Sequence, residues 1–445
     1  MDTAAYRPSA ADLAFLDTLE RRSFDFFWET TDPKTGLVPD RYPTRAFSSI
    51  AAIGFGLSCY LVGAERGYIT REQARDRVET TLTYLWRLPQ SADKVQTAGY
   101  KGFFYHFLRY ENGLRYRDTE LSSIDTALLL AGILSCQTYF DRDDSSETNI
   151  RMVADSIYRR VEWTWMTTKP PVVSMGWHPE NGSQKGGKFI DSNWDGYDEA
   201  MILYVLALGS PTFAPDSTVW KQWTEPYVWG KFYGGEEHVN FSPLFGHQYS
   251  HVWIDFRGIQ DDYMQAKGTN YFENSRRATY ANRAYCLANP MQWRDYGDSL
   301  WGLTACDGPA DTSFVRNGKP VQFHSYWARG ASLLEIHDDG TLAPTAAGGS
   351  VPFAPEICIP ALRGFEAKYG EKFFKRYGFL DAINPSYAAT DTGSGWIDVD
   401  YLGIDQGPIV LMLENYRSEF VWKLMQRNPY IRRGLMRAGF QGGWL

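Results

Sequence analysis

Three acidic residues lie at or near the start of strongly apolar stretches of the chain. Glu199 precedes AMILYVLALG, Asp125 lies within SSIDTALLLAGIL, and Asp405 precedes QGPIVLMLENY. A carboxyl group among apolar residues is unfavourable unless it lies at a helix end or is used. Glycoside hydrolysis uses two such groups, because one carboxyl protonates the leaving oxygen and the other activates water or attacks the sugar. These three acids are our candidate catalytic residues.

Glu199 is the leading candidate for the acid. Counted helically, it shares a face with Ile202, Leu203 and Leu206. Burial there would raise the pKa of its carboxyl, whereas a helix N-terminus would lower it, so the group could be tuned for general acid work. The alternative is that acids at these positions only cap helices, which is our interpretation of Asp198.

Aromatic and polar side chains are plentiful in the stretches around these acids. Aromatic residues make up 16% of the chain, including 16 Trp and 28 Tyr, which favours a pocket that stacks on sugar rings. His247 and His251 are four residues apart but lack the HExxH pattern, so we predict no metal site there. Arg, Asp and His in that stretch fit hydrogen bonding to sugar hydroxyls better. The candidate substrate-binding residues are Asp118, Trp194, Tyr197, His251, Trp253, Asp255, Arg257 and Trp396.

Composition excludes several other classes of protein. The formal net charge of -8 argues against a nucleic-acid partner and against an anionic membrane surface. No apolar run approaches the roughly 18 residues of a membrane span. The five Cys are scattered without a CxxC pair, so we expect no disulfide framework, and we expect Cys59 and Cys136 to be buried thiols. The first residues, MDTAAYRPSAADLAF, do not have the pattern of a secretory leader.

Hydrophobic spacing predicts a chain of helices, of which very apolar ones alternate with amphipathic ones. Ser9 with Asp12, and Thr70 with Gln73, have the capping-box spacing that starts a helix. The predicted helices span residues 9–29, 48–67, 70–87, 122–140, 149–165, 198–208, 269–287, 355–368 and 406–424.

The alternation of helix types predicts the architecture. A helix that is apolar on all faces must be covered on all faces. Two concentric rings of helices provide such cover, so we predict an all-α fold, an (α/α)6 barrel, in a single domain over residues 1–445. Long loops rich in Gly and aromatic residues would form a substrate cleft. These loops are 171–197, 230–263, 289–330 and 382–404.

Several long stretches resemble one known family. They are SFDFFWETTDPKTGLVPDR (23–41), SSIAAIGFGL (48–57), IDTALLLAGIL (124–134), GYDEAMILYVLALGS (196–210) and GIDQGPIVLMLENYRS (403–418). In these stretches the chain is similar to the bacterial glycoamylase-like proteins. That group includes glycoside hydrolase family 144, the β-1,2-glucan hydrolases, and the related region of cyclic β-1,2-glucan synthases.

The resemblance implies an (α/α)6 barrel that acts on β-1,2-linked glucan without a cofactor. It implies that Glu199, in the YDEAMILY match, is the catalytic acid, and that Asp405, in the GIDQGP match, is a second essential carboxylate. Family members place further acids in the segment of Asp118 and Asp125. Ser122 stands where another acid is expected, which leaves room for a different linkage or for transfer to another sugar.

Three functions follow from these observations. The leading expectation is an inverting hydrolase of β-1,2-glucan or its oligosaccharides, in which Asp405 or Asp125 activates water. The first alternative is a transglycosylase that remodels or cyclises such glucans, and the second is a non-catalytic glucan-binding protein. For the leading function we expect a saccharide as partner, no nucleic acid, no membrane span, a monomer, and a periplasmic or secreted location.

Overall fold

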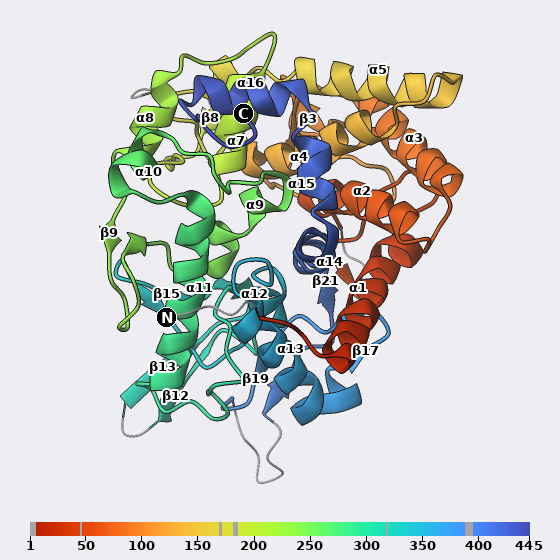
Figure 1. Cartoon of the computed structure of the whole chain (residues 1–445). Helices are drawn as coiled ribbons and strands as arrows, with labels where there is room; N and C mark the ends of the chain where they lie inside the picture. Colours follow the sequence, from red (N-terminus) through yellow and green to blue (C-terminus); the bar gives the residue numbers. More distant parts are fainter. Residues whose placement is uncertain (1–5, 45–46, 169–170, 181–185, 317–318, 388–394) are drawn as a thin grey trace.

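Two rings of helices form the framework of the computed structural model, which describes residues 6–44, 47–168, 171–180, 186–316, 319–387 and 395–445. In the described part of the chain six helices are buried along nearly their whole length and form the inner ring (Figure 1). The inner helices are α2 (Ile50–Glu65), α4 (Ser123–Tyr139), α7 (Met201–Gly209), α9 (Tyr249–Trp253), α12 (Pro344–Gly348) and α14 (Gly403–Ser418). The fold is the predicted (α/α)6 barrel.

The outer helices each bury one face against this ring. In α3, for example, Ala74, Val78 and Leu82 are buried at helical spacing, while charged residues cover the other face. The outer helices are α1 (Ala10–Thr30), α3 (Arg71–Arg87), α5 (Ser145–Arg159), α11 (Tyr271–Ala288), α13 (Pro355–Tyr369) and α16 (Pro429–Arg437). Shorter helical segments are α6 (Trp163–Met166), α8 (Thr218–Thr224), α10 (Asp262–Lys267), α15 (Phe420–Met425), η1 (Leu244–His247) and η2 (Gly370–Lys372).

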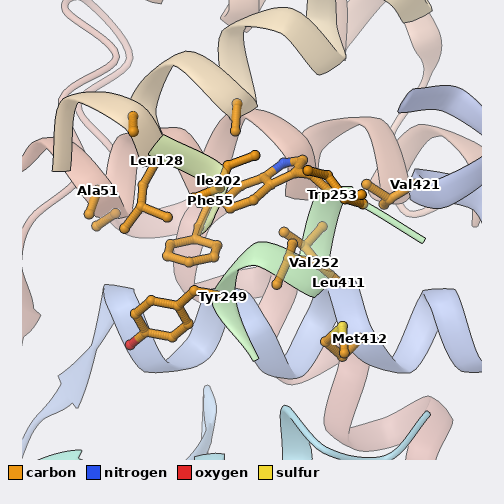
Figure 2. Close-up of a cluster of buried hydrophobic side chains, with 14 of the residues drawn as sticks. Ala51, Phe55, Leu128, Ile202, Tyr249, Val252, Trp253, Leu411, Met412 and Val421 are labelled. Carbon is orange, nitrogen blue, oxygen red and sulfur yellow. The ribbon is translucent and has the colours of Figure 1, made fainter. Parts of the chain in front are cut away.

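The barrel centre is a dense aromatic and aliphatic core (Figure 2). Trp253 of α9 stacks on Phe55 of α2 with ring centroids 5.0 Å apart, and both side chains are fully buried. Helices α2 and α4 approach closely because glycines face each other: a Cβ at Gly132 would lie 2.0 Å from the carbonyl oxygen of Gly54. The inner ring therefore depends on small residues as well as on apolar ones.

Short antiparallel strands join the helices at the loop ends. The largest sheet has the order β3 (Gly99–Tyr100), β4 (Phe103–Tyr105), β6 (Leu121–Ser122), β7 (Gly176–His178), β8 (Lys188–Phe189). The two-stranded pairs are β1 (Arg41–Tyr42) with β21 (Tyr401–Leu402), β2 (Ser48–Ser49) with β5 (Phe107–Leu108), β9 (Trp229–Gly230) with β10 (His238–Val239), β11 (Ala305–Cys306) with β14 (Trp327–Ala328), β12 (Thr312–Arg316) with β13 (Lys319–Phe323), β15 (Gly330–Ala331) with β16 (Ile336–His337), β17 (Phe374–Lys375) with β18 (Gly378–Phe379), and β19 (Ile383–Asn384) with β20 (Trp396–Ile397).

The helix boundaries differ from prediction in four places. The helix expected at 149–165 is α5, which ends at Arg159, followed by the separate α6. The helix expected at 198–208 begins at Met201, so Glu199 lies in the preceding turn. The expected helix 406–424 is two helices, because Glu419 adopts a left-handed conformation (φ 59°) that ends α14. The predicted loop 230–263 contains the inner helix α9, which is too short to give a periodic pattern.

Two further expectations can be compared with the structure. No helix in the described part of the chain is long and apolar enough to cross a membrane. All five cysteines are buried free thiols, as predicted for Cys59 and Cys136.

Candidate active site

A cavity of about 290 Å³ opens at the end of the barrel where the inner helices α4 and α14 begin. Its polar lining consists of His106, Glu120, Ser122, Asp125 and Glu199. Its aromatic lining consists of Trp194, Phe245, Tyr249 and Tyr326, and the rest is Ile124, Leu128, Met175, Ile190, Ala305 and Ile404. Its volume is near the lower end of the range for small-molecule sites.

Asp125 is held at the start of α4 by the residue that caps this helix. Ser122 Oγ donates to Asp125 Oδ2 (2.6 Å) and accepts from the Asp125 backbone N–H (3.2 Å). Ser122 therefore caps α4, whereas the Asp125 carboxyl faces the cavity. Burial raises the pKa of Asp125, and the neighbouring His106 opposes that rise.

His106 lies between two carboxylates on the same wall. Its Nδ1 is 2.7 Å from Glu120 Oε1, and its Nε2 is 3.4 Å from Asp125 Oδ1. Burial alone would lower the pKa of His106, but Asp125 and Glu120 raise it to about 9. The ring is therefore an imidazolium at neutral pH, and it supplies a positive charge next to Asp125.

Glu199 enters the cavity from the turn that leads into α7. Asp198 Oδ1 accepts the backbone N–H of Ala200 (2.8 Å), so the neighbouring acid shapes the turn and Glu199 is not needed for it. Ser250 of α9 donates from Oγ to the Glu199 backbone oxygen (3.1 Å) and fixes its position. Burial, with a smaller contribution from the Asp125 charge, raises the pKa of Glu199 to about 7. A carboxyl with this pKa can donate a proton near neutral pH.

Asp405 lies beside the cavity rather than on its lining. It occupies the first turn of α14 and is 3% exposed, while its neighbour Ile404 reaches the cavity. Thr345 Oγ1 donates to the backbone oxygen of Asp405 (3.1 Å), which anchors the turn. Burial raises the pKa of Asp405 to about 7, and the Asp381 carboxyl is within hydrogen-bonding reach of it. The structure thus brings Asp125 and Glu199 to one cavity and puts Asp405 behind its wall.

The aromatic wall of the cavity has both rigid and exposed members. Trp194 is fixed because its Nε1–H donates to Ser123 Oγ (2.9 Å). Tyr249 packs edge-on against Phe55 in the core (Figure 2). Tyr326 is 51% exposed, so its ring is accessible at the cavity mouth.

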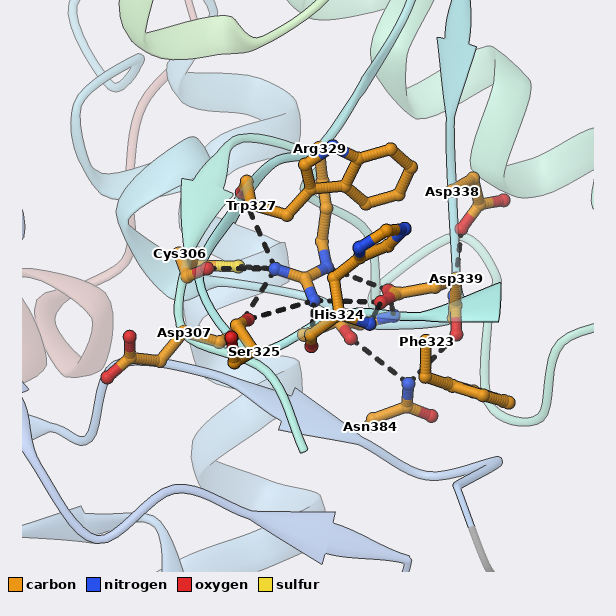
Figure 3. A network of polar contacts seen from close by, with 12 residues as sticks. Cys306, Asp307, Phe323, His324, Ser325, Trp327, Arg329, Asp338, Asp339 and Asn384 are labelled. Carbon is orange, nitrogen blue, oxygen red and sulfur yellow. Dashed lines mark hydrogen bonds and ion pairs between the residues drawn. The ribbon is translucent and has the colours of Figure 1, made fainter. Parts of the chain in front are cut away.

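A buried ion pair fixes the loop that carries Tyr326. The Arg329 guanidinium binds the Asp339 carboxylate through two contacts, of 2.7 and 2.8 Å, and both side chains are fully buried. The same guanidinium donates to the backbone oxygens of Cys306 (2.8 Å) and His324 (3.0 Å), as Figure 3 shows. Hydrogen bonds to this one guanidinium therefore hold strand β11 and the residues on both sides of Tyr326 in place.

Five of the predicted substrate-binding residues lie away from the cavity. Trp253 and His251 are buried in the core, where Trp253 Nε1–H donates to Ser58 and His251 Nε2 is 3.0 Å from Ser275 Oγ. Tyr197 is buried among aromatic rings of the outer layer. Asp255 and Arg257 form a bidentate ion pair with each other, with distances of 2.8 Å. The sequence could not distinguish these structural residues from sugar-binding ones, because both kinds combine polar and aromatic groups.

The remaining predicted residues keep a place near the site. Trp194 lines the cavity. Asp118 is exposed in the turn before β6, the strand that leads to Ser122. Trp396 lies in β20, two residues before Asp398, and packs on a small cluster that includes Cys306.

Sequence reasoning missed His106, Glu120, Tyr249 and Tyr326. His106 stands alone in FFYHFLRY, whose short strands carry no recognisable motif. It becomes a site residue because β4 pairs with β6, in the register Tyr105 with Leu121, next to Glu120. The only signal that could have found it is a lone histidine within an aromatic stretch, which is a weak signal.

Known proteins resemble this chain over nearly its whole length. A crystal structure from Bacteroides uniformis, described as a putative glucoamylase, is 30% identical, with a TM-score of 0.83 over 99% of this chain and 100% of that chain. The endo-β-1,2-glucanase of Chitinophaga pinensis, solved with sophorotriose and glucose, is 27% identical, with a TM-score of 0.83 over 98% of this chain and 100% of that chain.

A curated relative is the exo-β-1,2-glucooligosaccharide sophorohydrolase (non-reducing end) of Parabacteroides distasonis. It is 28% identical over 458 residues, which cover 96% of this chain and 58% of that protein, so the chain spans less than two thirds of this relative's length. The profile of the glycoamylase family, described as "Putative glucoamylase", matches residues 191–429, which include Glu199 and Asp405. This match covers more than half of the sequence, and the chain belongs to the glycoamylase family.

Proposed function

We propose that this chain is a glycoside hydrolase that cleaves β-1,2-linked glucan or its oligosaccharides. The observation that carries the proposal is the meeting of two carboxyl groups, Glu199 and Asp125, on one cavity with aromatic walls. Burial raises the pKa of both groups, as expected where protons are exchanged during catalysis. The linkage is proposed from the relatives, which are named for β-1,2-glucans and their oligosaccharides.

Glu199 is the proposed general acid. A pKa of about 7 keeps a large share of this carboxyl protonated at neutral pH, and its position on the cavity wall allows it to reach a bound glycosidic oxygen. Donation of that proton lets the leaving sugar depart as an alcohol.

A second carboxylate is the proposed base that activates water, and two residues can fill this role. Asp125 lines the cavity directly and is accompanied by the His106 imidazolium, which stabilises its charged form. Asp405 lies behind Ile404 and would act through an intervening water or sugar hydroxyl. Inversion requires room for a water molecule between the base and the sugar. We propose that the site provides this room and that the enzyme inverts the anomeric carbon.

Aromatic rings supply the proposed sugar contacts. Trp194 and Tyr249 form rigid walls, and Tyr326 offers an exposed face at the mouth. Asp118, which is exposed two residues before the cavity-lining Glu120, can accept hydrogen bonds from sugar hydroxyls of a longer chain.

Incubation of the protein with linear β-1,2-glucan tests the proposal. We expect short oligosaccharides whose total mass has gained one water per bond cleaved, and no release from β-1,3- or β-1,4-glucan. Products without that gain of water would indicate a transglycosylase. Saturable binding without turnover, unchanged in Glu199→Gln, would indicate a non-catalytic binding protein. Proton NMR of the first products reports the anomer and hence inversion or retention.

Chemical rescue distinguishes the two candidate bases. Azide is a nucleophile that needs no base, so it should restore turnover to the variant that lacks the base. We expect rescue in either Asp125→Asn or Asp405→Asn and none in Glu199→Gln. Rescue in neither variant would reject both residues as the base.

We further propose that the protein acts as a monomer in the periplasm or outside the cell. The location is proposed from the family resemblance, because members of that family act on exported glucans. Size-exclusion chromatography with light scattering checks the first point, and fractionation of the native host checks the second.

A further inference from the structure

Three aspartates from separate loops converge beside the cavity. Asp307 follows β11, Asp381 follows β18, and Asp398 follows β20. One carboxylate oxygen of each lies within 4.8 Å of one oxygen of the other two. Calcium ions bind oxygen atoms at about 2.3–2.6 Å, so two oxygen ligands on opposite sides of one ion are separated by about twice that distance.

Each of these carboxylates is held by one of its two oxygens. Asp381 Oδ2 accepts the backbone N–H of Asp307 (2.8 Å), and Asp398 Oδ1 accepts that of Val399 (2.6 Å). Asp307 Oδ2 is 2.5 Å from Arg41 Nη1. The three carboxyl groups are therefore fixed in place and cannot turn away from one another without breaking these contacts.

One buried oxygen of the cluster has no partner within the described residues. Asp398 is 7% exposed, and no hydrogen-bond donor reaches its Oδ2. Asp381 is 3% exposed, and the Asp405 carboxyl lies within hydrogen-bonding reach of it, so a proton or a cation must lie between these two acids. Buried carboxylate oxygens that lack a donor are strongly unfavourable unless a cation or a proton occupies the space.

The loops that carry the cluster are rigid. Arg329 holds the backbone oxygen of Cys306, directly before Asp307, and Figure 3 shows the Asp307 carboxylate pointing away from that network. The backbone N–H of Asp381 donates to the Asp400 oxygen (2.9 Å), and that of Asp398 donates to the Ala382 oxygen (3.0 Å). A rigid set of ligands favours selective binding of an ion.

We propose that Asp307, Asp381 and Asp398 form a binding site for a divalent hard cation, with calcium as the best-fitting ion. All available ligand atoms are carboxylate oxygens, which suit calcium and magnesium rather than softer metals. Calcium is favoured because it accepts several carboxylate ligands, whereas magnesium usually keeps several waters and binds one or two carboxylates. The proposed site departs from the expectation from sequence, which was that the protein binds no metal.

Titration of the full-length protein with calcium chloride, after treatment with EDTA and desalting, tests the site. We expect one calcium ion per chain by calorimetry and a rise in the thermal midpoint of about 2–4 °C at saturating calcium. Magnesium should bind more weakly. Asp398→Asn and Asp381→Asn should each weaken calcium binding at least tenfold. Asp311→Asn is the matched control, since it removes an exposed acid from the same part of the chain and should bind calcium like the wild type.

The result that overturns the proposal is equally direct. If calcium or magnesium up to about 10 mM gives neither heat of binding nor a thermal shift, protons and not a cation neutralise the cluster. This concentration is well above the dissociation constants of the weakest extracellular calcium sites. Calcium binding that is unchanged in Asp398→Asn would place the ion elsewhere. The wild-type titration decides the question even if a variant fails to fold. Because binding and stability are the readouts, the outcome is independent of whether the chain cleaves glucan.

Discussion

At the scale of single residues, the protonation of Glu199 should govern the activity. Burial raises the pKa of Glu199 to about 7, and a general acid works only while protonated. We therefore expect kcat/KM to fall about tenfold per pH unit above about pH 7, with an apparent pKa near 7. A profile measured on β-1,2-linked oligosaccharides checks this. Constant kcat/KM from about pH 6 to about pH 9 would remove Glu199 from the role of acid.

His106 should stabilise the fold in a pH-dependent manner. Its pKa is raised to about 9 in the folded state by Asp125 and Glu120, against the opposing effect of burial, while the unfolded value is about 6.5. The stabilisation is therefore fully present below about pH 6.5 and is lost as the pH rises through about 9. After allowance for partial exposure, His106→Gln should lower the free energy of unfolding by about 2 kcal/mol at about pH 6.

Urea unfolding of His106→Gln and the wild type at two pH values measures this difference. The gap should shrink above about pH 9.5, where the wild-type ring is neutral. His337→Gln, at a half-buried histidine outside the cavity lining, is the control for the loss of an imidazole ring elsewhere in the chain. An equal loss of stability at both pH values for His106→Gln would mean that packing, not charge, explains the effect.

At the scale of elements, the contact between α2 and α4 should tolerate no added methyl group. A Cβ at Gly132 would lie 2.0 Å from the Gly54 backbone oxygen, which cannot move without shifting α2. Gly132→Ala should therefore lower the free energy of unfolding by about 3 kcal/mol or prevent folding. Gly297→Ala is the control, because a Cβ there meets no atom within 4 Å. Similar thermal midpoints for both variants would contradict the close packing.

The helices that carry the barrel could be predicted from the sequence. The capping boxes at Ser9 and Thr70 are present as expected, and α4 begins one residue after its cap Ser122. These signals are local, since a cap and a periodic apolar face depend on neighbours within a few residues. Local sequence patterns of the same kind identified Asp125 and Glu199 as candidate site residues, and both line one cavity.

The rest of the site could not be predicted because it depends on contacts distant in sequence. His106 meets Glu120 through pairing of strands two or three residues long, which leave no alternation to recognise. Trp253 and His251 look like ligand-binding residues in sequence, but Trp253 donates to Ser58 and His251 Nε2 lies next to Ser275 Oγ in the core. Only tertiary structure distinguishes a satisfied polar residue from an available one.

At the scale of the whole molecule, the chain should unfold as one unit. The inner ring links elements from α2 near the N-terminus to α14 near the C-terminus, and one hydrophobic cluster runs from Phe15 to Phe440. We therefore propose a single domain over residues 1–445 and expect one calorimetric transition. Two well-separated transitions, with sugar shifting only one of them, would divide the chain into two domains.

The central claim is that Glu199 donates the proton that cleaves a β-1,2 linkage. The most direct test compares the turnover of wild type and Glu199→Gln on one β-1,2-linked oligosaccharide of defined length. We predict cleavage by the wild type and a loss of about a thousandfold in kcat for the variant, without loss of binding. Full cleavage by Glu199→Gln, or no cleavage by the wild type, would contradict the account.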